Sequence, residues 1–195
     1  MRLLSKYNPI NYLCFTLIIL LSSCSINGSF KGLYSYYEKT QKEKPNLIIS
    51  NQNSNTLCNI KNDSIARIYT INGYNLKNCI ANQVKTICYI WAPRCKGKFC
   101  YSLNAVQNKC KSLSSDLFIV SEYYDSEMMS VKYNLDKPIF GIDTKYYKSD
   151  LTSNYMSNFI KDLTAKDKVN GRFLLFKNGL YITSCLSLDS IPSYF

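Results

Sequence analysis

Residues 90–100 read IWAPRCKGKFC and lie between an apolar run and a segment with helical periodicity. The run before them, 86–91, is almost entirely apolar or aromatic, as in a strand covered on both faces. The segment after them, 98–113, spaces its apolar side chains three and four residues apart, which predicts one face of a helix. Cys95 and Cys100 therefore lie where a predicted strand gives way to a predicted helix.

The rest of the chain predicts an α/β fold with a mixed sheet. Residues 116–123 (DLFIVSEY) are a second buried run, so 84–123 predict a β-α-β unit with parallel strands. Residues 138–143 predict a short strand, and 152–165 predict a helix with one apolar face. Residues 173–182 predict two antiparallel strands, and this order of elements predicts helices on both faces of the sheet.

Two Asn-Gly dipeptides predict turns. Asn178-Gly179 lies between the last two predicted strands, where a type I′ turn would join them. Asn72-Gly73 lies between shorter apolar runs and carries the same signal. Both positions are expected to reverse the chain.

The N-terminus has the features of an export signal. Arg2 and Lys6 precede a short apolar segment, Leu13–Leu21, which is too short to span a bilayer as a stable helix. It ends in Leu-Ser-Ser-Cys at Cys24, which resembles a bacterial lipobox, in which the cysteine is lipidated and becomes the first mature residue. The alternative is an ordinary secretory signal in which Cys24 carries no lipid.

The lipobox interpretation divides the chain into three parts. We expect a signal peptide over 1–23, a lipidated N-terminus and tether over 24–45, and a folded domain over 46–195. A lipid on Cys24 makes the membrane the expected partner. The expected location is the bacterial cell envelope, with the domain facing the periplasm or the exterior.

Composition excludes several kinds of function. The chain has no histidine, which removes Ser-His-Asp and Cys-His catalysis and histidine-based zinc sites, and we expect neither a metal nor a cofactor. The formal net charge is +11, but the lysines are scattered among Asn, Tyr and Ser, and there is no zinc-finger spacing. Nucleic acid is therefore not an expected partner.

Cysteine usage fits an oxidising compartment, where disulfides persist. The chain has 9 cysteines; Cys14 leaves with the signal and Cys24 takes the lipid, so the domain keeps an odd number. At least one thiol is then free or pairs with another molecule. Cys88 and Cys110 lie on apolar faces and are expected to be small core residues.

The order of elements and the stretch at residues 90–95 resemble the thioredoxin superfamily. Its members carry a buried strand, Trp-Ala, one or two residues, and a Cys-x-x-Cys that opens a helix; this chain matches up to the first cysteine. The stretch FLLFKNGLY at 173–181 is similar to the last hairpin of the family. The resemblance covers about residues 65–185 and implies a three-layer sandwich with a mixed central sheet and a C-terminal β-hairpin.

The resemblance assigns roles to the residues that match its motif. Cys95 corresponds to the attacking cysteine, and Trp91 and Pro93 to the flanking shell. Cys100 would be the resolving cysteine, but four residues separate it from Cys95. The family also has a cis-proline before its last hairpin; Arg172 occupies that place here, and a trans peptide bond is expected because a cis bond before a non-proline residue costs about 2.5–4 kcal/mol.

The residues around Cys95 favour a reactive thiolate independently of the resemblance. Arg94, Lys96 and Lys98 supply three cations, and a helix that starts close by would lower the thiol pKa. On an ideal helix Cys95 and Cys100 would lie about 140° apart around the axis. A loop at Lys96-Gly97 would restore disulfide reach, with Cα atoms about 4.4–6.8 Å apart.

Two functions remain open on the sequence. The first is an exported, membrane-anchored thiol–disulfide oxidoreductase acting on protein thiols or disulfides, with Cys95 attacking and Cys100 resolving. The second is a non-catalytic thioredoxin-fold lipoprotein that serves as a binding or structural module of the envelope, with its cysteines as staples. The altered spacing and missing proline favour the second, and the Trp-Ala-Pro-Arg-Cys context favours the first.

Overall fold

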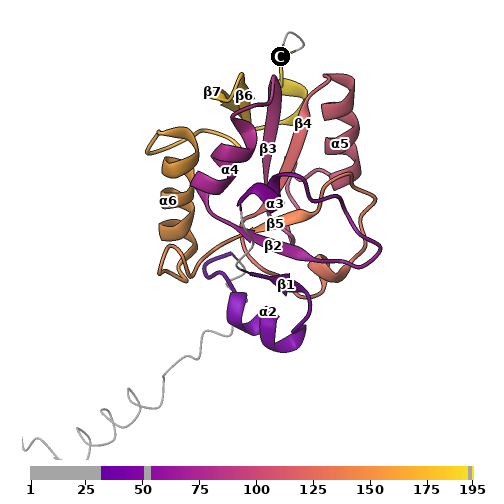
Figure 1. Cartoon of the computed structure of the whole chain (residues 1–195), viewed down its shortest axis with the longest axis vertical. Helices are drawn as coiled ribbons and strands as arrows, with labels where there is room; N and C mark the ends of the chain where they lie inside the picture. The colour runs from indigo at the N-terminus through magenta and orange to yellow at the C-terminus, as the bar shows by residue number, and fades with distance from the viewer. Residues whose placement is uncertain (1–31, 51–53, 193–194) are drawn as a thin grey trace, which may run out of the picture. The chain divides into compact units, whose positions relative to one another are not determined.

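A computed structural model describes residues 32–50, 54–192 and 195, and this part of the chain has an α/β fold (Figure 1). Its strands are β1 (Ile48–Ile49), β2 (Ile68–Ile71), β3 (Lys85–Trp91), β4 (Asp116–Ser121), β5 (Ile139–Ile142), β6 (Phe173–Lys177) and β7 (Leu180–Cys185). Its helices are α2 (Tyr37–Glu43), α3 (Ser54–Cys58), α4 (Gly73–Ile80), α5 (Leu103–Ser112) and α6 (Thr152–Thr164), with 3-10 turns η1 (Met128–Ser130) and η2 (Leu188–Ser190).

The described strands form one mixed sheet of seven strands in the order β1-β2-β5-β4-β3-β6-β7. β3 is parallel to β4 on one side and antiparallel to β6 on the other, and β6 is antiparallel to β7. The predicted parallel pair around α5 is therefore confirmed, as are the α/β class and the mixed sheet. β3 lies where the sheet changes from parallel to antiparallel, and the predicted cysteine site follows its last residue.

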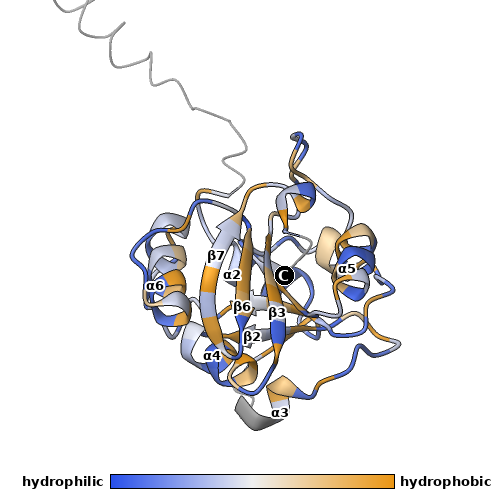
Figure 2. Cartoon of the chain, turned by 90° about the horizontal axis from the view of Figure 1, so that it is seen from above, coloured by the Kyte–Doolittle hydropathy of each residue, from blue (hydrophilic) through white to orange (hydrophobic). Residues whose placement is uncertain are grey.

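Helices cover both faces of the sheet because β3 is apolar on both of them. Ile87, Tyr89 and Trp91 join a buried cluster with α5, whereas Cys88 and Ile90 join a second cluster with α4 and α6. The view from above shows α5 on one side of the strands and α4 with α6 on the other (Figure 2). Successive side chains of a strand point to opposite faces, so a continuous apolar run requires two covering layers.

Helix α5 starts five residues later than its periodicity predicts. Ser102 is the N-cap, and its side chain accepts a hydrogen bond from the Ala105 N–H at 3.3 Å. Phe99, expected on the buried face, is instead in a loop and is 40% exposed. The serine hydroxyl is a better hydrogen-bond acceptor for the first helical N–H groups than the glycine-containing stretch before it. The helix therefore begins after Ser102.

The folded unit also starts earlier than the predicted boundary at residue 46. Tyr37 on α2 is buried, and its ring packs edge-on against Tyr124 at a centroid distance of 5.2 Å. The Ser35 carbonyl accepts a hydrogen bond from the Tyr124 N–H at 2.7 Å. The expected tether over 24–45 is therefore wrong for residues 34–45, because aromatic burial outweighs their polar composition.

The two Asn-Gly dipeptides have different conformations. Asn178 and Gly179 have φ of 50° and 75°, as a type I′ turn requires, and they join β6 to β7. Asn72 has an extended backbone, and its side chain accepts from the Asn75 N–H at 2.8 Å, so it is the N-cap of α4 and no turn forms there.

Gly73 begins α4 at a point of close approach to α6. A Cβ at this position would lie 2.5 Å from the Phe159 carbonyl oxygen and 3.0 Å from the Leu163 nitrogen. Both atoms belong to the α6 backbone, which cannot move without disturbing the buried face of that helix. By contrast, a Cβ at Gly97 would lie 3.7 Å from the Cys100 Sγ, an ordinary contact.

We expect Gly73→Ala to lower the free energy of unfolding by about 1–3 kcal/mol, because the added methyl overpacks the contact between α4 and α6. Gly97→Ala is the matched control and should change stability by less than about 0.5 kcal/mol. Urea unfolding followed by circular dichroism measures both. Equal stability of the two variants would show that α4 and α6 do not approach as closely as described.

Candidate functional site

Cys95 and Cys100 form a disulfide directly after β3. Their Cα atoms are 5.6 Å apart, within the range for a disulfide. The loop predicted at Lys96-Gly97 is present: the Cys95 N–H donates to the Ala92 carbonyl at 3.1 Å, and the Cys100 N–H donates to the Gly97 carbonyl at 3.1 Å. Because α5 begins only after Ser102, both cysteines belong to one irregular loop, in which their sulfurs meet.

The two cysteines differ in exposure and in hydrogen bonding. Cys95 is exposed and Cys100 is half-buried. The Gly97 N–H donates to the Cys100 Sγ at 2.8 Å. Cys95 is therefore the more exposed residue of the pair, which is the difference expected between an attacking and a resolving cysteine.

Arg94 does not act as a free cation beside Cys95. Its Nε donates to the Asp125 Oδ2 at 2.7 Å, one of its terminal nitrogens donates to the Asp125 Oδ1 at 3.1 Å, and it also pairs with Glu127. These carboxylates raise the pKa of Arg94, and they compensate its charge. The prediction of three cations beside Cys95 is wrong on this point, and Lys96 and Lys98 remain.

Arg94 instead links the cysteine loop to the segment after β4 through a hydrogen bond and an ion pair. Its backbone N–H donates to the Tyr123 hydroxyl at 3.0 Å, and its guanidinium contacts Asp125 two residues further on. The Glu122 N–H donates to the Trp91 carbonyl at 2.7 Å, so the ends of β3 and β4 lie side by side. These acidic residues were not predicted from the sequence, although the carboxyl ends of parallel neighbours share one edge of a sheet.

A cavity of about 400 Å³ opens beside the two sulfurs. Trp91 and Pro93 of the predicted shell line it together with both cysteines. Met128 and Tyr133, which the sequence analysis did not single out, complete the wall, and the Tyr133 ring packs edge-on against Trp91 at 5.8 Å. The disulfide therefore borders a cavity whose lining includes the aromatic residues Tyr89, Trp91, Tyr101 and Tyr133.

Arg172 is half-buried and directly precedes β6, the antiparallel neighbour of β3. Its carbonyl accepts from the Ile90 N–H at 2.8 Å, and its guanidinium pairs with Glu122 at 2.9 Å and donates to the Ile90 carbonyl at 3.2 Å. No peptide bond in the described part of the chain is cis, as expected for this residue. Arg172 does not line the cavity beside the sulfurs; it lines a separate groove together with Ile90 and Glu122.

The other described cysteines do not join this site. Cys58 and Cys79 form a disulfide between α3 and α4, with Cα atoms 4.9 Å apart. Cys88 and Cys110 are buried, as predicted, and burial raises the pKa of both thiols, to about 12 for Cys110. Cys185 is half-buried and has no disulfide partner in the described structure. Cys24, the predicted lipidation site, lies outside the described residues.

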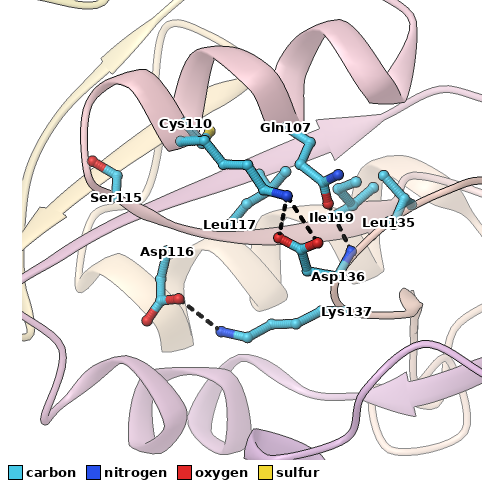
Figure 3. Close-up of a pocket in the computed structure, with 10 residues that line it drawn as sticks. Gln107, Cys110, Ser115, Asp116, Leu117, Ile119, Leu135, Asp136 and Lys137 are labelled. Atoms are coloured by element: carbon cyan, nitrogen blue, oxygen red, sulfur yellow. Dashed lines mark hydrogen bonds and ion pairs between the residues drawn. The ribbon is translucent and has the colours of Figure 1, made fainter.

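Cys110 borders a second, much smaller cavity of about 60 Å³ (Figure 3). Two ion pairs line it, Lys111 with Asp136 at 2.8 Å and Lys137 with Asp116 at 3.2 Å. A space of this size has room for only a few water molecules. The cavity has charged walls and borders a buried neutral thiol, so we do not assign it as a second thiol site.

Comparison with known proteins gives no relative: no family model, curated protein or solved structure matches this chain. Among residues 32–50, 54–192 and 195, no group of three or more acidic or cysteine side chains is placed to hold a metal ion. None of the helices described is long and apolar enough to cross a bilayer.

The exposure of the thiols predicts their order of modification. In the native oxidised protein at pH 8, Cys185 should react with a maleimide, whereas Cys88 and Cys110 should not, because burial keeps them neutral and inaccessible. Both should react after unfolding in guanidinium chloride. Peptide mapping by mass spectrometry identifies the modified residues, and rapid native labelling of Cys88 or Cys110 would contradict the described core.

Proposed function

We propose that this chain is a thiol–disulfide exchange protein with a thioredoxin-like fold. The order of β3, a cysteine-bearing loop, α5 and the parallel strand β4 supports the fold assignment. The later helix α6 and the antiparallel pair β6–β7 continue the order that the resemblance implies. The observation that carries the function is the pairing of an exposed Cys95 with a half-buried Cys100 beside an open cavity.

The proposed reaction needs only these two thiols. In the reduced protein, the Cys95 thiolate attacks one sulfur of a substrate disulfide, and the other substrate sulfur leaves as a thiolate. The Cys100 thiolate then attacks the Cys95 sulfur, and the second substrate sulfur leaves. The substrate gains two electrons, the protein is left with the Cys95–Cys100 disulfide, and a dithiol reductant restores it.

We place this activity at the cell envelope, with the membrane as partner through a lipid on Cys24. The support is the sequence of the N-terminus together with the second disulfide, Cys58–Cys79, which is a staple between two helices. Such staples persist in oxidising compartments and are rare in the cytosol. The substrate of an exchange protein in that space is a protein thiol or disulfide.

One observation favours the second candidate, a non-catalytic envelope module. The Arg172 side chain is tied to Glu122 and to the Ile90 carbonyl at the position where the family carries its cis-proline. A substrate peptide that pairs with the backbone there would meet a bound guanidinium. In that case Cys95–Cys100 would be a staple like Cys58–Cys79, and the experiment below separates the two functions.

We expect the purified protein to accelerate the reduction of insulin by dithiothreitol, measured as turbidity. Cys95→Ser should reduce the rate to that of the uncatalysed blank, because the attacking thiolate is gone. Cys100→Ser, reduced and then freed of dithiothreitol before insulin is added, should instead accumulate a mixed disulfide with the insulin chain, visible on a non-reducing gel, because attack still occurs and resolution does not.

The matched control is Cys185→Ser, which removes a half-buried thiol outside the site and should leave the rate unchanged. A wild-type rate equal to the blank would overturn the exchange function and favour the structural module. A mixed disulfide that forms on Cys100 in the Cys95→Ser protein would reverse the two assigned roles.

A further inference from the structure

The cavity beside the sulfurs has walls that would accept an aromatic side chain. Its apolar lining includes Trp91, Tyr133, Met128, Tyr101 and Leu103. Its volume of about 400 Å³ lies within the range of about 300–1,000 Å³ that is typical of ligand pockets. Aromatic rings and a thioether give favourable contacts to another aromatic ring.

Hydrogen bonds hold these walls in place in the absence of a ligand. The Met128 N–H donates to the Asp125 Oδ1 at 2.9 Å, and the Tyr133 hydroxyl donates to the Met128 carbonyl at 3.1 Å. Asp125 is in turn held by Arg94. A preformed cavity of this kind loses less conformational entropy when a side chain enters it than an unordered one would.

The cysteine loop beside this cavity carries two exposed cations. Lys96 and Lys98 are exposed, and within the described residues neither forms an ion pair. The nearby guanidinium of Arg94 is already compensated by carboxylates. The uncompensated positive charge therefore lies on the loop that carries Cys95, next to where a substrate sulfur must arrive, and it favours an acidic neighbour there.

We propose, on the basis of the exchange function above, that the substrate is a protein segment whose disulfide-bonded cysteine lies between an acidic and an aromatic residue. The aromatic side chain enters the cavity beside Met128 and Tyr133. The acidic side chain lies against Lys96 and Lys98. The substrate sulfur is then held at the exposed Cys95, where the first exchange step occurs.

A second groove provides an internal control. Met156 and Ile160 of α6 line it together with Arg172; its volume is about 540 Å³, and neither cysteine of the site borders it. Met156 is half-buried, as is Met128. If selectivity comes from the cavity at the sulfurs, truncating Met156 leaves it unchanged.

The test uses symmetrical disulfide dimers of the peptides Glu-Cys-Phe, Glu-Cys-Ala and Lys-Cys-Phe, with 2-hydroxyethyl disulfide as a reagent that has neither feature. Each reacts with the reduced protein, freed of dithiothreitol, in a single turnover, and released peptide thiol is measured by chromatography after acid quench. We expect the Glu-Cys-Phe dimer to react about tenfold faster than the Glu-Cys-Ala dimer. We expect the Glu-Cys-Phe dimer to react about two- to fivefold faster than the Lys-Cys-Phe dimer at low salt, and this difference in rate to vanish at high salt.

Variants assign each preference to its part of the site. Met128→Ala should reduce the Phe:Ala ratio, and Met156→Ala should not. Lys96→Ala with Lys98→Ala should remove the Glu:Lys preference, whereas Lys77→Ala, which removes an exposed lysine on α4, should not. In the unaltered protein, 4-methylphenol should inhibit exchange with the Phe-containing dimer and not exchange with the Ala-containing dimer. This measurement tests the cavity without any substitution.

The outcomes separate this inference from the exchange function. Exchange at equal rates for all three peptides would overturn the substrate assignment and leave the function standing. A Phe preference that survives Met128→Ala and resists 4-methylphenol would overturn the role of the cavity. The absence of exchange with every disulfide, including 2-hydroxyethyl disulfide, would overturn the exchange function and the inference with it.

Discussion

The N-cap at Ser102 is the constraint on which the cysteine site depends. It fixes the start of α5 at Leu103, so the residues after Trp91 are not wound into a helix and bend back on themselves. If the helix began near Lys98, Cys100 would lie inside its first turn, and the geometry of its partner would be set by helical rise and rotation. The delayed start instead allows two cysteines with four intervening residues to come within 5.6 Å at their Cα atoms.

The position of that loop depends on the parallel pairing of β3 with β4. Both strands end at the same edge, so residues that follow β4 are presented to residues that follow β3. Arg94 uses this proximity: it pairs with Asp125 and Glu127 and holds the loop against the segment that supplies Met128 and Tyr133. The ion pairs are partly exposed and contribute mainly position, because solvent weakens their net energy.

The sequence was sufficient for the central β-α-β unit, since the apolar run of β3 and the helical period of α5 are strong local signals. It was not sufficient to predict where α5 starts or which conformation Asn72 adopts. At Asn72 a side-chain helix cap competes with a turn, and both use the same residue types. The pairing of Arg94 with Asp125 joins residues 31 positions apart and leaves no local pattern. Burial of Tyr37 likewise depends on Tyr124, which a composition-based boundary does not include.

The central claim is that Cys95–Cys100 is a reversible redox pair and Cys58–Cys79 a staple, and equilibration with glutathione buffers of defined potential tests it most directly. Acid quench, alkylation of free thiols and mass spectrometry then give the oxidised fraction of each pair. The account predicts a single two-electron transition for Cys95–Cys100 between about −120 and −270 mV, with Cys58–Cys79 oxidised throughout. A Cys95–Cys100 pair that stays oxidised below about −300 mV would be structural and would contradict the account.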